Sequence, residues 1–353
     1  MKIIVDVMGG DNAPGELVKG LCCAAENSRA EFIVVGDEKA IKRVARENSL
    51  DISSFEIYGA SDVVEMTDDP ITVIRKKPDS SMMAGLHLLA DGKGDAFVST
   101  GNTGALFAGA THVVRRLKGI QRAGIASVLP LKNPILLLDS GANINVTPEQ
   151  LETFAVMGSV YMKKIFGIER PRVGLLNNGS EECKGTELQT EAYKLLSSNS
   201  AIRFVGNIEA NKLPFDVCDV LVADGFTGNI LIKSIEGMGR LMIDSLKDIF
   251  LSNGVTKVSA LLVKKQLSAM KKKFDTREYG GAPLIGLQKP VIKAHGNSDA
   301  KAFASAIRQA ISFASSKVTE EVAEEAAKMR EKRLAEAELN ASRTAADGDE
   351  GIK

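Results

Sequence analysis

The chain has 353 residues, of which 44% are hydrophobic and 25% charged, the composition of a folded globular protein of one or two domains. Basic and acidic side chains both number 45, so the formal net charge is zero and we expect no nucleic-acid partner. No apolar run reaches the roughly 18 residues that span a bilayer, and the N-terminus lacks a secretory signal pattern, so we expect a cytoplasmic protein.

Short β-branched runs alternate with longer helical patterns from the first residue to about residue 316. This alternation predicts an α/β fold with a doubly wound, mostly parallel sheet and helices on both faces. The predicted strands are residues 3–7, 32–35, 55–58, 96–99, 135–138, 173–176, 202–205, 220–223 and 291–294. The clearest helices are residues 148–166, with Thr147 as cap and Pro148 in the first position, and residues 230–251.

The last segment, residues 317–353, differs in composition from the rest of the chain. It is rich in Ala, Glu, Lys and Arg, and its 7 basic and 10 acidic side chains give it a net charge of −3, which leaves +3 for residues 1–316. We therefore expect one large α/β catalytic domain over residues 1–316, followed by a solvated helix that frays into a disordered tail.

Glycine and asparagine gather in six loops that directly follow predicted strands. These loops are residues 7–14, 99–105, 139–145, 176–185, 223–229 and 293–299. In open α/β sheets, ligands bind beyond the carboxyl ends of the strands, where helix N-termini present free N–H groups. Lys184 adds a cation, so the set suits phosphate or a developing oxyanion, although each glycine alone could serve a turn or a helix cap.

Several familiar sites are missing from the sequence. It contains no G-x-x-x-x-G-K-[ST] motif, no G-x-G-x-x-G after the first strand, and no G-x-S-x-G elbow. The four cysteines lack C-x-x-C spacing, so we expect reduced thiols, and three histidines without H-E-x-x-H make a metal site unexpected. His295 lies at a strand end beside Gly296, where a functional and a structural role are equally reasonable.

A cationic cluster at residues 74–82 combines Arg75 with Ser80 and Ser81 ahead of a predicted helix. An arginine fork and serine hydroxyls at a helix start suit a phosphate group. The alternative is a solvated loop in which Ser80 or Ser81 serves only as the helix cap.

Seven motifs in order resemble the bacterial acyl-ACP:phosphate acyltransferases of phospholipid synthesis, over residues 1 to about 316. They are DVMGGDNAP from Asp6, IRKKPDSSM from Ile74, STGNTGAL from Ser99, LNNGSEECKG from Leu176, DGFTGN from Asp224, YGGAPLIGL from Tyr279 and VIKAHGNSD from Val291. Ser140, where the family usually carries an apolar residue, and the long acidic tail depart from the family pattern.

The resemblance implies a Rossmann-like fold with the architecture of isocitrate and isopropylmalate dehydrogenases, and a homodimer. It also implies transfer of a fatty acyl group from acyl-ACP to inorganic phosphate, which yields the acyl phosphate used by a membrane glycerol-3-phosphate acyltransferase. A thioester is already activated and phosphate is itself a nucleophile, so we expect no cofactor and no metal.

The hypothesis assigns Lys184 and Asn229 as the catalytic pair that holds phosphate and the oxyanion. The remaining expected phosphate or substrate contacts are Gly9, Gly10, Arg75, Ser80, Ser81, Gly101, Asn102, Thr103, Gly104, Asn143, Asn177, Gly225, His295 and Gly296. Cys183, beside Lys184, could instead be an acylated nucleophile, which attack by phosphate makes unnecessary.

Residues 250–274, the lysine-rich segment, hold six lysines and no acidic residue within a helical insert expected at about 245–275. On one helix, the apolar side would carry Val255, Val258, Leu262, Val263, Leu267 and Met270, and the other side Lys257, Lys264, Lys265, Lys271 and Lys272. We expect Val258, Leu262, Lys264 and Lys265 to contact the inner membrane surface or ACP, while packing on the protein's own core or a dimer partner remains the alternative.

Three other functions remain open. A phosphate acyltransferase that uses CoA would need similar loops, whereas a dehydrogenase of the isocitrate type would need metal-binding aspartates that the sequence does not assemble. A peripheral scaffold that binds lipid or acyl carriers without chemistry would not need the converging loops.

Overall fold

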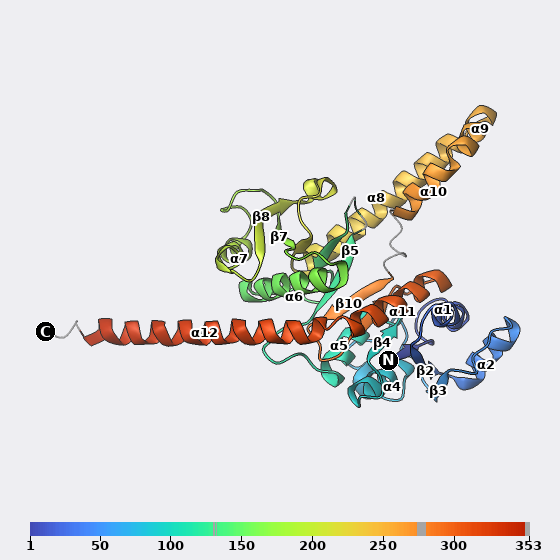
Figure 1. The fold of residues 1–353 in the computed structure, drawn as a ribbon, viewed down its shortest axis with the longest axis horizontal. Coiled ribbons are helices and arrows are strands. Elements are labelled where there is room, and N and C mark those ends of the chain that lie inside the picture. The colour runs from blue at the N-terminus through green and yellow to red at the C-terminus, as the bar shows by residue number, and fades with distance from the viewer. Residues whose placement is uncertain (130, 132, 274–279, 350–353) are drawn as a thin grey trace.

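The structure is a computed structural model that describes residues 1–129, 131, 133–273 and 280–349 (Figure 1). Its strands are β1 (Lys2–Asp6), β2 (Glu31–Gly36), β3 (Glu56–Gly59), β4 (Ala96–Ser99), β5 (Gly124–Leu129), β6 (Ile135–Leu138), β7 (Arg172–Asn177), β8 (Arg203–Glu209), β9 (Val220–Val222), β10 (Gly281–Ile285) and β11 (Val291–Ala294). They form one sheet in the order β3-β2-β1-β4-β11-β10-β5-β6-β9-β7-β8.

Most neighbouring strands are parallel, which confirms the predicted fold class. Seven pairs are parallel, and the three antiparallel pairs all lie at the centre, where β10 joins β11 and β5, and β5 joins β6. The nine predicted strands are all present, but β5 and β10 were not predicted. Pro283 and Gly281 inside β10 argue against a central strand in the sequence, because proline has no backbone N–H to donate to a neighbouring strand and glycine weakens a strand interior.

Helices cover both faces of the sheet, and each face has its own core. They are α1 (Gly15–Glu26), α2 (Glu38–Glu47), α3 (Val73–Lys76), α4 (Ser81–Ala90), α5 (Thr103–Val113), α6 (Pro148–Phe166), α7 (Glu187–Ser198), the short η1 (Ala210–Phe215), α8 (Gly225–Leu251), α9 (Gly254–Leu262), α10 (Lys264–Lys273), α11 (Ala300–Ser315) and α12 (Val318–Asp349). One continuous core lies under α1, α6 and α11. On the other face, α4 and α5 cover one core and α8 covers another, and the candidate site lies between these two.

Helix α6 begins and ends where the sequence predicts. Thr147 and Gln150 form a capping box at its start, and Gly167 in the left-handed conformation, with φ of 70°, ends it. Phe154 and Tyr161 are fully buried, so this helix anchors the second half of the sheet.

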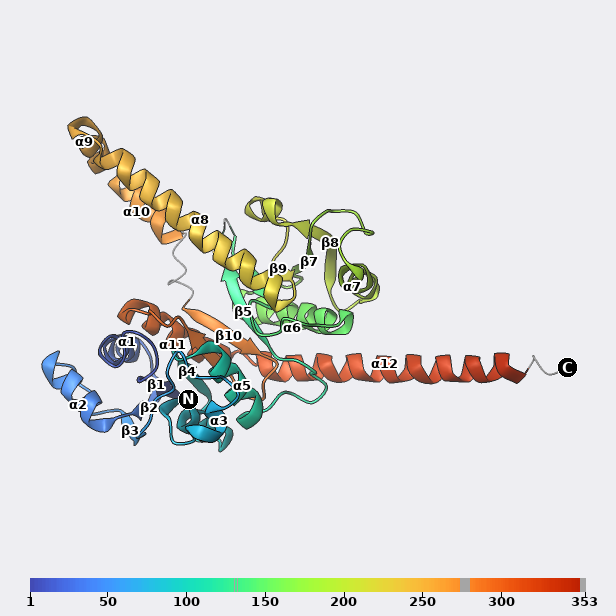
Figure 2. The same ribbon diagram turned by 180° about the vertical axis from the view of Figure 1, so that it is seen from behind.

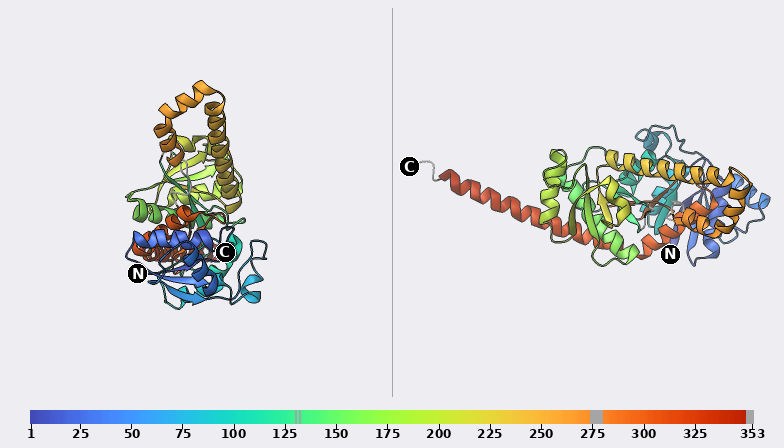
Figure 3. Two further views of the ribbon diagram at one scale, coloured as in Figure 1. Left: turned by 90° about the vertical axis from the view of Figure 1, so that its right-hand side faces the viewer. Right: turned by 90° about the horizontal axis from the view of Figure 1, so that it is seen from above.

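The lysine-rich segment is not the single helix on which its apolar and lysine sides were assigned. Asn253 caps α9 by accepting a hydrogen bond from the Thr256 N–H at 2.9 Å, and the chain turns again at Val263 before α10. Together α8, α9 and α10 form an arm that stands away from the sheet (Figures 2 and 3). No residue of α9 is buried, and Val258 and Leu262 are 60% and 79% exposed. Phe274, the last residue of the segment, lies outside the described residues.

Helix α12 corrects two expectations about the C-terminal segment. Its first turns are buried rather than solvated, because Val318, Val322 and Ala326 recur every four residues and pack into the core, while Glu321 pairs with Lys163 at 2.9 Å. The helix also continues to Asp349, through the stretch predicted to be disordered, and extends well beyond the body (Figure 3). Residues 350–353 lie outside the described residues. No described helix is both long and apolar enough to cross a membrane.

Candidate active site

A cavity of about 430 Å³ opens between α5 and α8 above the central strands of the sheet. Thr103 and Gly104 border it from the first turn of α5, and Asn229, the fifth residue of α8, borders it from near the start of that helix. Both helices therefore direct their positive N-terminal ends towards the same space. The strands and strand ends contribute four further polar residues to the lining, Lys293, His295, Ser127 and Ser140.

Three of the predicted loops are bound to one another next to this cavity. The Thr100 hydroxyl donates to the Gly9 carbonyl oxygen, and the Asp11 N–H donates to the Gly296 carbonyl oxygen at 2.8 Å. Gly10 has φ of 86°, and a Cβ there would lie 2.6 Å from the Gly296 oxygen. Glycine at this position is therefore required by the contact between loops, independently of any ligand.

A buried carboxyl group organises the first of these loops. Asp6, with 0% exposure, accepts hydrogen bonds from the Ser99 hydroxyl at 2.7 Å and from the Met8 N–H at 3.0 Å. Ser99 in turn accepts from the Gly101 N–H at 3.1 Å. Burial raises the pKa of the Asp6 carboxyl, against the lowering effect of these hydrogen bonds.

A second buried aspartate shapes the loop after β6. The Asp139 carboxylate accepts from the Ile125 N–H at 3.1 Å and from the Asn143 N–H and side-chain amide at 2.6 and 2.8 Å. It also accepts from the N–H groups of Gly141 and Ala142. Burial raises the pKa of Asp139, and the Asn143 hydrogen bond is the main opposing effect. The carboxylate therefore fixes residues 139–143 as a compact turn.

Helix α8 begins in contact with this turn, and the contact sets the position of Asn229. Asp224 caps the helix by accepting from the Thr227 N–H at 2.8 Å, and the Gly225 N–H donates to the Asn143 carbonyl oxygen at 2.7 Å. A Cβ on Gly228 would lie 2.0 Å from the Asp139 carbonyl oxygen, so only glycine allows the helix to approach this closely.

Lys293 is the most unusual group that lines the cavity. It is 8% exposed, and its ammonium donates to the carbonyl oxygens of Thr100, at 3.3 Å, and Ala294. Burial lowers the pKa of Lys293 from 10.5 to about 8. The negative charge of Asp11 raises this pKa, and the positive charge of Lys233 lowers it. Sequence reasoning included the loop at 293–299 but did not single out this residue; a lysine inside the apolar run VIKA was the available signal.

His295 lines the same cavity and is exposed to solvent. The surrounding protein desolvates the imidazole and lowers its pKa; Glu236 opposes this effect, while Lys293 and Lys233 add to it. His295 therefore favours the neutral form, which can donate or accept a hydrogen bond.

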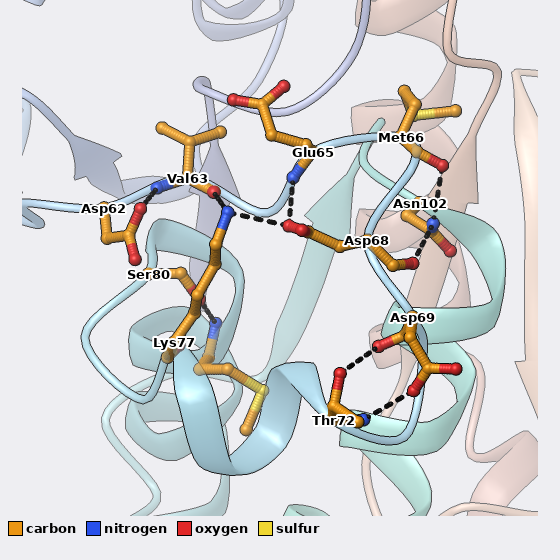
Figure 4. A network of polar contacts seen from close by, with 11 residues as sticks. Asp62, Val63, Glu65, Met66, Asp68, Asp69, Thr72, Lys77, Ser80 and Asn102 are labelled. Atoms are coloured by element: carbon orange, nitrogen blue, oxygen red, sulfur yellow. Dashed lines mark hydrogen bonds and ion pairs between the residues drawn. The ribbon is translucent and has the colours of Figure 1, made fainter.

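A surface segment that contains Met66 and Asp68 is tied to the start of α5 (Figure 4). The Asn102 side-chain amide donates to the carbonyl oxygens of Met66, at 2.9 Å, and Asp68, at 3.2 Å, while its oxygen caps α5. Lys77 pairs with the Asp68 carboxylate at 2.7 Å, also seen in Figure 4. The polar atoms of Asn102 are thus occupied by the protein itself.

The structure gathers only part of the predicted set around the cavity. Thr103, Gly104, Asn229 and His295 line it together. Arg75 lies exposed on the short helix α3, outside the cavity lining. Ser80 and Ser81 are 0% and 1% exposed, and Ser80 caps α4 as the alternative interpretation held, so neither hydroxyl is open to a ligand here.

The other predicted residues support the loops rather than line the cavity. Gly9 and Gly101 are in close backbone contact, Asn143 donates to the Ala123 carbonyl oxygen at 2.7 Å, and Gly225 packs on Asn143. Tyr279, which opens one of the family motifs, lies outside the described residues.

Lys184 is exposed and lies against Gly179, outside the lining of the cavity. Its loop is held in place by two asparagines: Asn177 donates to the Lys184 carbonyl oxygen at 3.0 Å, and Asn207 donates to the Glu181 carbonyl oxygen at 2.8 Å. The neighbouring Cys183 is exposed, and all four cysteines are free thiols. Among the described residues, no group of three or more His, Cys, Asp or Glu is placed to hold a metal ion.

Solved structures similar to this one confirm the architecture. A phosphotransacetylase from Streptococcus pyogenes covers 89% of this chain and 94% of its own, with a TM-score of 0.59 and 18% identity. A branched-chain phosphotransacylase from Enterococcus faecalis covers 90% of this chain and 100% of its own, with a TM-score of 0.54 and 17% identity. At this level of identity, the likeness concerns the fold.

The helix N-termini, the buried lysine and the neutral donors around one cavity suit an enzyme with an anionic substrate, and sequence comparison specifies an acyltransferase. A family model described as fatty acid synthesis protein matches residues 1–321. A phosphate acyltransferase from Thermoanaerobacter pseudethanolicus is 46% identical over 312 residues, covering 88% of this chain and 92% of its own. One from Lysinibacillus sphaericus is 45% identical over 313 residues, covering 88% and 93%. The chain belongs to the phosphate acyltransferase family, as its motifs suggested.

The close packing of α8 on the Asp139 turn can be tested with two glycines of the same helix. Gly228→Ala should lower the free energy of unfolding by about 1–3 kcal/mol, because the new methyl group meets the Asp139 oxygen. Gly237→Ala, which faces open space, should raise it by about 0.5–1 kcal/mol. Urea unfolding measures both, and equal effects in the two variants would refute the packing argument.

The buried charge of Lys293 should appear in the pH dependence of stability. Its native pKa, about 8, lies below 10.5, so the unfolded chain binds the proton more tightly and stability should rise with pH across that window. A difference of one pKa unit corresponds to about 1.4 kcal/mol. As the pH rises from 7 to above 10, the free energy of unfolding of the wild type should therefore increase by up to about 3 kcal/mol relative to that of Lys293→Met. Lys289→Met, two residues before β11 begins, is the control, and its stability should follow that of the wild type across this pH range. If the stability of Lys293→Met changed with pH in parallel with that of the wild type, the prediction would be contradicted.

Proposed function

We propose that the protein transfers a fatty acyl group from acyl-ACP to inorganic phosphate, forming acyl phosphate for phospholipid synthesis. Membership of the phosphate acyltransferase family supports acyl transfer that involves phosphate. The observation that carries the proposal within the structure is the cavity on which the N-termini of α5 and α8 converge. We further propose that residues 1–316 act as one catalytic unit.

The chemistry requires little beyond positioning and charge stabilisation. A phosphate oxygen attacks the thioester carbonyl carbon and forms a tetrahedral oxyanion; the C–S bond then breaks, the carrier thiolate leaves and takes up a proton, and the C–O bond to phosphate remains. Donors aimed at the oxyanion lower the barrier, and each such donor typically contributes a factor of 100 to 1,000. Asn229, near the start of α8, is proposed to be one of them.

Lys184 acts, in this proposal, from the exposed loop outside the cavity. An exposed lysine there suits the acyl-carrier side of the reaction, where the thioester enters and a negative charge develops on oxygen or sulfur. Cys183 is exposed beside it, so a covalent acyl-enzyme is the second mechanism to be tested.

The transfer reaction can be tested by trapping the product. Acyl-ACP and phosphate should together yield an acyl hydroxamate when hydroxylamine is added, and either substrate alone should not. Lys184→Ala and Asn229→Ala should each lower the rate by about 100-fold or more. Asn229→Ala removes a proposed donor to the oxyanion, and Lys184→Ala removes the proposed cation for the negative charge that develops on oxygen or sulfur at the acyl-carrier side. Liquid chromatography with mass spectrometry measures the hydroxamate.

The control is Lys194→Ala, which removes an exposed lysine of α7 that pairs with Glu191 at 2.7 Å. It should keep wild-type activity. Activity with acyl-CoA but not acyl-ACP would favour the CoA-dependent alternative, and binding of acyl carriers without any hydroxamate would favour a scaffold. A mass increase on Cys183 during turnover would replace direct attack by phosphate with an acyl-enzyme.

We also propose that the α8–α10 arm contacts the inner surface of the membrane, where a glycerol-3-phosphate acyltransferase would use the product. Four large apolar side chains of α9 are exposed, and lysines follow them in α10. They are Val255, Val258, Leu261 and Leu262, at 78%, 60%, 70% and 79% exposure. Apolar anchors next to lysines suit a bilayer with anionic lipids, whereas lysines alone would suit acidic ACP, and an apolar face alone would suit a second subunit of a homodimer.

Vesicle binding separates these possibilities. Wild type should co-sediment with vesicles that contain anionic lipid, and a variant with both Val258→Asp and Leu262→Asp should lose most of this binding while keeping its activity on acyl-ACP. Phe215→Asp, a change at an exposed apolar residue of η1, is the matched control and should bind like wild type. Normal vesicle binding by the double variant would argue against membrane contact through α9.

A further inference from the structure

We propose that Lys293 is the cation that binds the phosphate substrate, at the inner end of the cavity between α5 and α8. This inference rests on the proposed function and deepens it, because it places one of the two substrates.

The fold positions Lys293 with little freedom. It lies in β11, at the centre of the sheet, where its backbone pairs with Ser99 of β4 and Ala282 of β10. The ammonium donates to the carbonyl oxygens of Thr100 and Ala294, and the side chain is 8% exposed. An ammonium held on two carbonyl oxygens is oriented, and it keeps donor capacity for a third partner because it carries three N–H bonds.

The positive charge of Lys293 is not neutralised by the protein. None of the ion pairs found among the described residues includes Lys293, and the two carbonyl oxygens accept its protons without supplying a negative charge. Asp11 is the acidic group that acts on it electrostatically, and Asp11 is itself exposed to water. A buried charge without a counter-ion is costly to fold, so its presence in a cavity points to an anion that arrives later.

The other charges that line the cavity largely cancel. Lys233 and Glu236, one turn apart on α8, pair with each other at 3.0 Å. The remaining polar groups of the lining, Thr103, Asn229, Ser127 and Ser140, are neutral, and His295 favours its neutral form. Lys293 is therefore the uncompensated charge among the described residues that line this cavity, and it is positive.

The surroundings suit phosphate because neutral donors lie on several sides. Thr103 and Gly104 are the first residues of α5, whose N-terminus favours negative charge. Asn229 approaches from α8 across the cavity and rests against Gly141. A tetrahedral dianion placed between them would receive hydrogen bonds from two helices and the charge of one ammonium.

This placement gives Lys293 and Lys184 different roles in the proposed reaction. Lys293 is buried within the cavity, whereas Lys184 is exposed and outside its lining. Removing Lys293 should therefore affect phosphate binding, and removing Lys184 should affect the acyl-transfer step. If Lys293 had a purely structural role, its removal would instead raise the KM for phosphate and the KM for acyl-ACP together.

The direct test is binding of inorganic phosphate, measured as a rise in melting temperature at constant ionic strength with chloride as the balancing anion. Wild type should be stabilised as phosphate is added. Lys293→Met and Lys293→Gln should both lose this dependence, and Lys293→Arg should keep part of it because the charge remains. The control variant Lys289→Met should respond like wild type.

Steady-state kinetics supply the second readout. In Lys293→Met the KM for phosphate should rise about 10- to 100-fold, the loss expected for one charge-assisted hydrogen bond, while the KM for acyl-ACP stays within about twofold. An unchanged phosphate KM and an unchanged phosphate-dependent melting shift in Lys293→Met and Lys293→Gln would overturn the proposal, as would a wild type that phosphate does not stabilise.

The two proposals fail in different ways. If wild type is stabilised by phosphate through Lys293 but makes no acyl hydroxamate, the proposed reaction is wrong and the phosphate site stands. If wild type makes acyl phosphate and the Lys293 variants use phosphate equally well, the reaction stands and Lys293 is not its phosphate ligand.

Discussion

The arrangement of the site depends on two buried carboxylates that collect backbone N–H groups at the ends of strands. Asp6 is the last residue of β1 and Asp139 directly follows β6. Each turns the chain into a glycine-containing loop by accepting hydrogen bonds from the residues after it. A buried carboxylate without such partners would cost several kcal/mol, so the loops and the charges stabilise each other. The positions of Gly101, the Thr100 loop and the start of α8 all follow from these two turns.

Close backbone packing then brings the helix ends together. Gly10 and Gly228 stand where a side chain would collide with a carbonyl oxygen of another loop, and these contacts allow α8 and the 293–299 loop to approach the centre of the sheet. The cavity lies where the core under α4 and α5 ends and the core under α8 begins. Two helix N-termini meet there as a result of sheet topology. Short polar side chains at these helix starts are therefore long enough to reach a ligand in the cavity.

The sequence predicts the parallel part of the fold well, because strands buried on both faces are continuously apolar and can be recognised without their partners. It does not predict β10, in which Pro283 pairs with Ile292 of β11 but lies before Leu284 and Ile285, the residues that pair with β5, a register that only the folded sheet reveals. The same reasoning applies to the site. Asn229 and His295 follow strands and were expected, whereas the burial of Ser80 and of Lys293 is decided by segments distant in sequence. Loop composition thus identifies the edge of the sheet at which the cavity opens, but it does not separate residues that line the cavity from those that support it.

The buried ammonium of Lys293 lowers the stability of the folded protein. Burial within β11 lowers its pKa to about 8, which means that the protein carries an unfavourable charge at neutral pH whenever the cavity holds no anion. Phosphate would remove this penalty by supplying the counter-charge, so part of the binding free energy comes from relief of a cost already present in the folded chain. A surface lysine gains little from the same contact, because water and salt already screen it. A buried ammonium therefore gains more from an anionic ligand than an exposed lysine would.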